Sequence, residues 1–202
     1  MEYLVTMTTH VPDGTPEAAV DDVRAREAAH SHELAAQGHL LRLWRPPLQR
    51  GEWRSLGLFA ADDADQLEQV LASMPLRVWR TDEVTPLSPH PNDPGPAPAA
   101  EHKTAEFLTT FSVKVPEGTP GQTVGEAGAG EADRARELAR QGHLVRLWRL
   151  PGQGRALGLW RAMDAAEMQT IVESLPLTAN AWMTTETTAL TQHPSDPALS
   201  GR

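Results

Sequence analysis

The strongest constraint on the fold of this chain is an internal repeat. Residues 37–45 return almost unchanged as residues 141–149, a spacing of 104 residues (141 − 37). The segment 11–16 returns at the same spacing as 115–120. Two further pairs follow in the same order at slightly smaller spacings: residues 73–76 with 174–177, and residues 90–94 with 193–197. Chance does not produce four ordered matches, so the sequence predicts a tandem duplication in which each copy is one structural unit.

The repeat predicts two domains and a linker. The first unit is expected to span residues 1–91 and the second residues 105–202, with residues 92–104 between them. The linker is rich in proline and alanine. Because proline lacks a backbone N–H group and blocks helix formation, an extended and semi-rigid connector is expected there.

Within each copy the hydrophobic pattern predicts the order strand, helix, strand, strand, helix, strand. This order is typical of the ferredoxin-like βαββαβ arrangement, in which helices cover one face of an antiparallel sheet. The other face needs a partner, and the second copy can supply it. The predicted fold class is therefore α+β, with two ferredoxin-like units forming an intramolecular pseudo-dimeric α+β barrel. In the first copy the expected elements are strand 3–8, helix 17–37, strand 39–45, strand 54–60, helix 62–73 and strand 79–85.

The two copies have diverged unequally. The first helix of the second copy contains Gly125, Gly128 and Gly130. Each glycine disfavours a helix interior by up to about 1 kcal/mol relative to alanine, so this helix is expected to start late or to fray. One complete site and one eroded or reshaped site are therefore expected.

Composition excludes several classes of function. The chain has 18 Lys and Arg against 27 Asp and Glu, a formal net charge of −9, which argues against nucleic acid and anionic membranes as partners. It has no cysteine, so disulfides, thiolate nucleophiles and cysteine-bound metals are excluded. No signal peptide or apolar run of about 20 residues is present, and a cytoplasmic protein is expected. The His-Ser-His-Glu sequence at 30–33 lacks the metalloprotease spacing, so no metal site is predicted.

Each half of the chain resembles the muconolactone delta-isomerase family. The resemblance rests on the opening strand that leads to Val-Pro at 11–12, on Glu27, on Leu-Trp-Arg at 43–45, on Met-Pro-Leu at 74–76 and on the terminal His-Pro at 90–91, with counterparts in the second half. It implies paired ferredoxin-like sheets and proton movement within an unsaturated lactone, without metal or organic cofactor. A small-molecule substrate is then the expected partner. Further homo-oligomerisation stays open.

The chain departs from the family pattern at two positions. The histidine that the family has in its second strand is replaced by Arg42 and Arg146. The lysine in the family's first helix is Arg24 in one copy and Gly128 in the other. Because a guanidinium group is not deprotonated at usable pH, the pocket can be inherited while the original reaction is not.

Two pairs of residues are the main catalytic candidates. Glu27 and Glu131 keep the family position, and a carboxylate in a water-poor pocket can remove and return a proton. The alternative is a solvent-exposed helix face. Arg42 and Arg146 lie in an apolar strand, where a charge needs a partner. They are expected to hold a substrate carboxylate or enolate oxygen, or to form ion pairs with Glu83 or Glu186.

The remaining candidates are aromatic and imidazole side chains. His39 and His143 follow a helix end, where they can act as general acids or interact with the helix dipole. The tryptophans are expected in the core, with some lining the cavity. The predicted substrate-binding set is Trp44, Trp148, Trp79, Trp182, Glu83 and Glu186.

These expectations combine into one function and two alternatives. The predicted function is a cofactor-independent isomerase, or a related proton-transfer enzyme such as a cyclase, acting on a small lactone-like or carboxylate-bearing metabolite. One alternative is a cofactor-free monooxygenase of specialised metabolism, which oxygen uptake would reveal. The other is a non-catalytic small-molecule-binding protein, which would bind its ligand unchanged.

Overall fold

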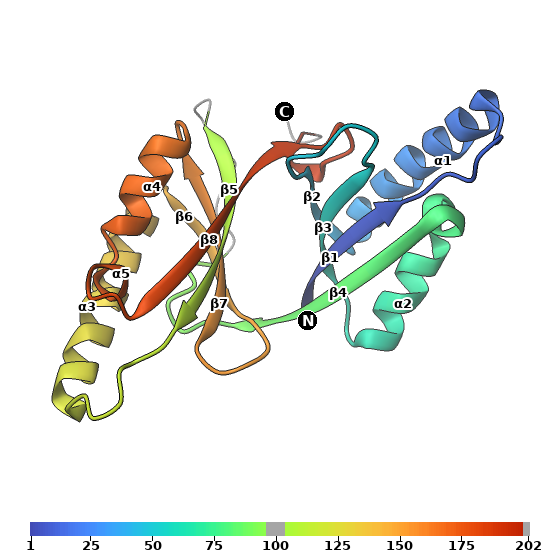
Figure 1. The fold of residues 1–202 in the computed structure, drawn as a ribbon. Coiled ribbons are helices and arrows are strands. Elements are labelled where there is room, and N and C mark those ends of the chain that lie inside the picture. The colour runs from blue at the N-terminus through green and yellow to red at the C-terminus, as the bar shows by residue number, and fades with distance from the viewer. Residues whose placement is uncertain (96–103, 200–202) are drawn as a thin grey trace. The chain divides into compact units, whose positions relative to one another are not determined.

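The computed structural model describes residues 1–95 and 104–199, and it divides into two compact units (Figure 1). Unit 1 comprises Met1–Leu87 and the last segment of the chain from Thr191, and unit 2 comprises Ser88–Leu190. The units are therefore not identical to the sequence repeats, because the end of each repeat is counted with the other unit. Most of the predicted linker, residues 96–103, lies outside the described residues.

Unit 1 has the predicted ferredoxin-like order of elements, with both helices on one face of an antiparallel sheet (Figure 1). The strand order is β4-β1-β3-β2, and Thr191 and Gln192 of β8 pair with the end of β2. The elements are β1 (Glu2–Thr9), α1 (Glu17–Ala36), β2 (Leu40–Arg45), β3 (Arg54–Ala60), α2 (Ala64–Ser73), the 3-10 helix η1 (Pro75–Trp79) and β4 (Arg80–Pro89).

Unit 2 repeats this arrangement, which confirms the predicted α+β class with two ferredoxin-like units. Its strand order is β8-β5-β7-β6, and Ser88 and Pro89 of β4 pair with the end of β6. The elements are β5 (Ala105–Val113), α3 (Gly121–Arg140), β6 (Leu144–Arg149), β7 (Arg155–Ala162), α4 (Ala165–Glu173), α5 (Pro176–Ala179) and β8 (Met183–Gln192); the 3-10 helix η2 (Pro197–Leu199) belongs to unit 1.

The end of α1 shows how local sequence directs the chain into the sheet. Gly38 has a φ of +79°, the left-handed conformation that glycine adopts without strain. The N–H of His39 then donates to the Leu34 carbonyl at 2.9 Å. Because this turn ends the helix, β2 begins two residues later at Leu40.

The prediction that α3 starts late was wrong. Both α1 and α3 are 20 residues long. The C-terminal half of α3 is anchored by buried Ala135 and Leu138, and a helix extends from an anchored turn at little further expense. Gly125 and Gly128 are exposed, so only their intrinsic propensity opposes the helix.

No helix in the described part of the chain combines the length and apolar character needed to cross a membrane.

Candidate functional site

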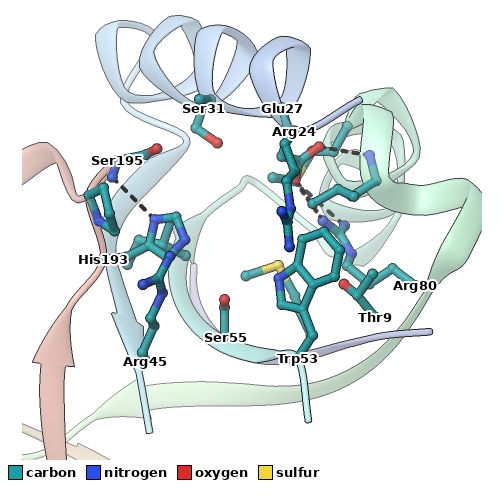
Figure 2. Close-up of a pocket in the computed structure, with 16 residues that line it drawn as sticks. Thr9, Arg24, Glu27, Ser31, Arg45, Trp53, Ser55, Arg80, His193 and Ser195 are labelled. Carbon is teal, nitrogen blue, oxygen red and sulfur yellow. Dashed lines mark hydrogen bonds and ion pairs between the residues drawn. The ribbon is translucent and has the colours of Figure 1, made fainter. Parts of the chain in front are cut away.

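Unit 1 contains a cavity of about 400 Å³ between α1, its sheet and the last segment of the chain (Figure 2). Apolar side chains from the sheet and η1 form part of its wall, with hydroxyl groups between them. Its charged and imidazole lining groups come from three separate elements and the last segment. The cavity is lined by Met7, Thr9, Arg24, Glu27, Ala28, Ser31, Leu43, Arg45, Trp53, Ser55, Met74, Leu76, Arg80, His193, Pro194 and Ser195.

Glu27 is held at one end of this cavity. It shares the inward face of α1 with Val23 and Ser31, because residues four apart lie on one side of a helix. Its side chain is only 12% exposed, so the alternative of a solvent-exposed helix face was wrong. Oε2 accepts a hydrogen bond from the N–H of Leu76 at 2.8 Å, and Oε1 accepts one from Nη1 of Arg80 at 3.1 Å. Burial raises the pKa of the Glu27 carboxyl group, and both hydrogen bonds oppose that shift.

Arg80 is held from behind by a second carboxylate. Its Nε donates to Oδ1 of Asp82 at 2.7 Å and its Nη2 to Oδ2 at 3.0 Å. Both side chains are 2% exposed. Arg77 also donates to Asp82, and its Nη2 lies 2.6 Å from Oε1 of Glu68. The guanidinium group of Arg80 is therefore fixed, with Nη1 directed at Glu27.

Arg24 and Trp53 lie next to each other in the wall of the cavity (Figure 2). The guanidinium carbon of Arg24 lies 4.4 Å from the centre of the Trp53 ring, a cation–π distance. The Arg24 side chain is 55% exposed, and its ion pair with Asp21 at 3.7 Å is on the helix surface. A half-exposed cation beside an aromatic wall can accept an anionic group at this side of the cavity.

The segment that ends the chain completes the cavity. Nδ1 of His193 accepts a hydrogen bond from the N–H of Ser195 at 3.1 Å, and Arg45 of β2 lies near the ring (Figure 2). Burial and the positive charge of Arg45 lower the pKa of His193 to about 4. The imidazole is therefore neutral near pH 7, and Arg45 carries the positive charge at this side.

Arg42 forms a buried ion pair rather than lining the cavity. Its Nε and Nη2 donate to Asp196 at 3.1 and 3.0 Å, and Asp196 also accepts the N–H of Leu43. The Asp196 side chain is fully buried, and the guanidinium group lies 4.8 Å from the ring centre of Trp44. The expected pairing with Glu83 was wrong, because the last segment of the chain returns to β2 and brings Asp196 to this position.

Unit 2 repeats this ion pair with different residues. Nε of Arg146 lies 3.1 Å from Oδ2 of Asp93, and the guanidinium group lies 4.8 Å from the ring centre of Trp148. Asp93 also accepts the N–H of Leu147 at 2.8 Å. The expected partner Glu186 is exposed on β8 instead. In both units the contacts explain why an arginine is tolerated in an apolar strand; substrate binding by Arg42 and Arg146 stays a prediction.

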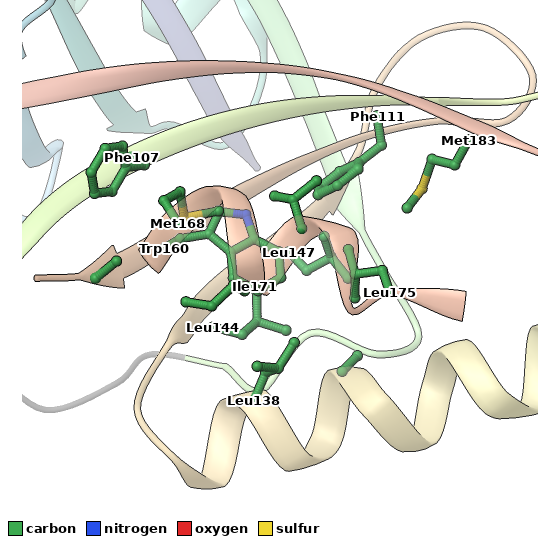
Figure 3. Close-up of a cluster of buried hydrophobic side chains, with 13 residues drawn as sticks. Phe107, Phe111, Leu138, Leu144, Leu147, Trp160, Met168, Ile171, Leu175 and Met183 are labelled. Atoms are coloured by element: carbon green, nitrogen blue, oxygen red, sulfur yellow. The ribbon is translucent and has the colours of Figure 1, made fainter. Parts of the chain in front are cut away.

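The corresponding cavity of unit 2 is much smaller, about 90 Å³. Glu131 is kept there, and its Oε2 accepts the N–H of Leu177 at 2.9 Å. Burial raises the pKa of its carboxyl group, with the Leu177 hydrogen bond as the opposing influence. Large apolar side chains now occupy the space: Phe111 and Trp160 pack edge to face with ring centres 6.1 Å apart (Figure 3).

The strand registers show how the residues around the two cavities differ. Thr9 faces Arg80 in unit 1, where Val113 faces Met183 in unit 2. The repeat spacing likewise places Phe111 at the position of Met7, Gly128 at that of Arg24 and Ala135 at that of Ser31. The polar side chains of Thr9, Arg24, Ser31 and Arg80 in unit 1 thus correspond to apolar residues or glycine in unit 2, and Met7 corresponds to the larger Phe111.

The other predicted residues lie away from the two cavities. The ring Nδ1 of His39 lies 3.0 Å from the Ala60 carbonyl, and that of His143 lies 2.9 Å from the Arg161 carbonyl. Both contacts join a helix end to the neighbouring strand. Trp44 and Trp148 are buried, Trp79 and Trp182 are half-buried, and Glu83 and Glu186 are exposed; none of them lines either cavity within the described residues.

Sequence reasoning missed Arg80 and Trp53, both of which line the unit 1 cavity. The repeat spacing changes from 101 to 103 residues between the pairs 76/177 and 90/193, so the strand registers, not the sequence alone, align Arg80 with its counterpart. Arg80 corresponds to Met183, and a charged residue that replaces a methionine at an inward strand position indicates a polar pocket. Within the described residues no group of three His, Cys, Asp or Glu side chains is placed to hold a metal ion.

Comparisons with known proteins match both halves of the chain. A family model described as muconolactone delta-isomerase matches residues 1–93 and 105–196. The muconolactone delta-isomerase of Cupriavidus pinatubonensis is 35% identical over 92 residues, which cover 46% of this chain and 97% of that protein. Muconolactone delta-isomerase 1 of Acinetobacter lwoffii is 33% identical over 92 residues, covering 46% of this chain and 93% of that protein.

One solved structure shares the fold over the full length. A heme-binding protein from Thermus thermophilus superposes with a TM-score of 0.62 and 11% identity, covering 100% of this chain and 95% of that one. At 11% sequence identity, this similarity shows a shared fold and does not extend to function. Since the family model covers both repeats and each curated relative has the length of one repeat, the chain belongs to the muconolactone delta-isomerase family and carries two units of that family in one polypeptide.

Proposed function

We propose that this chain is an isomerase that moves a proton within a small unsaturated lactone bearing a carboxylate, and that the cavity of unit 1 is its active site. Family membership supports the reaction class. The observation that carries the proposal is the position of Glu27, a largely buried carboxylate facing a cavity of about 400 Å³. That volume lies within the range of small-molecule sites.

The proposed reaction needs one base and one place for negative charge. Glu27 removes a proton from a carbon in conjugation with the lactone carbonyl, and the electron pair of that C–H bond moves into a dienolate. The Glu27 carboxylic acid then returns the proton two carbons away, so the double bond shifts and no atom is gained or lost. A carboxylate whose pKa is raised by burial is a stronger base for this step than an exposed one.

The cationic groups of the cavity suit an anionic substrate. Arg24 above Trp53 and Arg45 beside His193 approach the cavity from different elements. Either guanidinium group can hold a carboxylate through two parallel hydrogen bonds. The Trp53 ring and Met7 offer apolar surface to the carbon skeleton.

The test uses muconolactone, the compound after which the relatives from Cupriavidus pinatubonensis and Acinetobacter lwoffii are named. NMR should show the shifted double bond, and in D₂O the product should carry deuterium at the newly protonated carbon in those turnovers in which the Glu27 carboxylic acid exchanges its proton with solvent before returning it. Glu27→Gln keeps the size of the side chain but removes the base, and we expect it to lower kcat by about 10²–10⁴-fold. The matched control is Glu131→Gln in unit 2, which should keep most of the turnover.

Three results would contradict the proposal. Unchanged turnover in a folded Glu27→Gln variant would remove Glu27 from the reaction. Consumption of oxygen with an oxidised product would favour the monooxygenase alternative. Tight binding of muconolactone without any shift of its double bond would favour a binding protein.

A further inference from the structure

We propose that Arg80 is a positioning residue of the unit 1 cavity, which holds the Glu27 carboxylate for proton transfer, and that unit 2 has no equivalent. The inference rests on the proposed function of Glu27. Nη1 of Arg80 lies 3.1 Å from Oε1 of Glu27, and Arg80 itself lines the cavity.

The contacts of Arg80 show a group held in one orientation. Two of its nitrogens donate to Asp82, and Nη2 also lies 3.4 Å from the carbonyl oxygen of Leu71. Asp82 is held in turn by Arg77. With its other nitrogens engaged, the guanidinium group directs Nη1 at the catalytic carboxylate and has little freedom to move away.

The fold itself does not require this buried cluster. Met7 faces Asp82 in unit 1, and at the same register Phe111 faces Thr185 in unit 2. Arg80 corresponds in the same way to Met183. Unit 2 thus forms the same strands with a methionine and a threonine. Removing charged groups from water is unfavourable, and unit 2 forms the same strands without them. We therefore assign Arg80 and Asp82 of unit 1 a role in the site and not in folding.

Arg80 holds the second oxygen of the Glu27 carboxylate, so that both oxygens are fixed. Glu27 is held by the Leu76 N–H at Oε2 and by Arg80 at Oε1, whereas the described contact of Glu131 is the single Leu177 N–H. A base held at both oxygens keeps one lone-pair direction aimed at the substrate, which is how positioning lowers a barrier.

Other charged groups also face Glu27 or share its cavity. On α1 these are Arg24 and His30, on β4 Asp82, on β2 Arg45, and in the last segment His193. Arg80 is the charged side chain at hydrogen-bonding distance from Glu27 in the described contacts. Its charge opposes the rise that burial causes in the pKa of Glu27, and that of Asp82 reinforces the rise.

The test introduces the residues of unit 2 into unit 1 of the full chain. In Arg80→Met/Asp82→Thr, carbon-13 NMR of labelled glutamate side chains follows the titration of Glu27, identified by comparison with Glu27→Gln. We expect the Glu27 midpoint to rise, but by less than in a variant that loses Arg80 alone, because this variant also removes the charge of Asp82, which itself raises the Glu27 pKa. Glu131, titrated in the same sample, is the internal control and should not move.

Two further variants keep the inference open to refutation. Arg80→Gln leaves Asp82 paired with Arg77 and should raise the Glu27 midpoint by about one pH unit or more, because an opposite charge at this distance shifts a carboxyl pKa by about 1–3 units. A failure of the double variant to fold therefore does not end the test. Arg80→Lys keeps the charge and should shift the midpoint less than Arg80→Gln. An unchanged Glu27 midpoint in a folded Arg80→Gln variant would overturn the proposal.

Kinetics separate this inference from the proposed function. With muconolactone as substrate, Arg80→Gln should lower kcat about tenfold or more near neutral pH, and part of the loss should be regained as the pH rises. If the wild type does not turn over muconolactone while the Glu27 midpoint still shifts, the proposed function fails and the contact between Arg80 and Glu27 stands. Equal kcat values for Arg80→Gln and wild type at every pH would overturn the positioning role.

Discussion

At the scale of single residues, His193 predicts a dependence of stability on pH. Its pKa is about 4 in the folded chain, against about 6.5 for an unperturbed histidine. Between these values the unfolded chain binds the proton and the folded chain does not. The free energy of unfolding should therefore fall as the pH decreases from about 6.5 to 4. Because the ring is partly exposed, we expect roughly 1 kcal/mol of this loss to come from His193.

Urea denaturation of His193→Gln and wild type at several pH values checks this expectation. The difference between their free energies of unfolding should change over this interval, with the variant losing less stability on acidification. Glu27 contributes with the opposite sign, because its raised pKa stabilises the folded chain at low pH, but it is present in both proteins. A constant difference from neutral pH to about 4 would show that His193 keeps an ordinary pKa.

The residues of the site could be predicted only where a motif or a family position pointed to them. Glu27 was found because it keeps the family's place in the first helix. Arg80 was missed because no motif includes it, and its inward position depends on the register of β4 against β1. Arg42 was found as a buried cation, but its partner Asp196 is 154 residues away in the sequence, and no local pattern links the two.

At the scale of elements, α3 should gain stability from alanine. A Cβ atom added at Gly125 or Gly128 meets no other atom within 4 Å, and both positions are helical. Each Gly→Ala change should therefore raise the free energy of unfolding by about 0.5–1 kcal/mol. In a chain of this size that corresponds to an increase in Tm of about 1–4 °C, measurable by calorimetry.

Gly158 in β7 is the matched contrast. A Cβ atom there would lie 2.3 Å from Nε1 of Trp160 and 3.1 Å from the ring of Phe111. Because Trp160 is 2% exposed and packed in the core, Gly158→Ala should lower the free energy of unfolding by about 1–3 kcal/mol. Equal effects at Gly125 and Gly158 would mean that the packing around Trp160 is looser than the structure shows.

The order of elements was predictable because hydrophobic period, proline and glycine act locally. The strand 54–60 was predicted at its observed bounds, and α1 within one residue. The length of α3 could not be predicted, because the burial of Leu138 in the folded unit outweighs the low helix propensity of the glycines. The β4 strand begins at Arg80 rather than Trp79, since Pro75 initiates a turn of 3-10 helix that the alternation of side chains does not reveal.

At the scale of the whole molecule, the compact units differ from the sequence repeats. The repeat spacing assigns the second His-Pro-x-Asp motif, 193–196, to the second copy, but these residues lie in unit 1. The duplication was therefore predictable from sequence identity. The unit against which the last segment packs could not be predicted. Both copies end in the same motif, and the sequence is equally compatible with each motif packing against its own copy.

This assignment predicts different consequences for two equivalent aspartates. Asp196 is fully buried against Arg42 in unit 1, whereas the Asp93 side chain is 15% exposed against Arg146 in unit 2. Asp196→Asn should lower the free energy of unfolding by roughly 3 kcal/mol, because it leaves a buried guanidinium group facing a neutral amide, and Asp93→Asn should lower it less.

Since residues 193–195 line the unit 1 cavity, Asp196→Asn should also raise the KM for muconolactone, and Asp93→Asn should not. Thermal unfolding and steady-state kinetics on both variants measure these effects. A larger rise in KM for Asp93→Asn than for Asp196→Asn would place the working site in unit 2 and contradict the proposal that the unit 1 cavity is the active site.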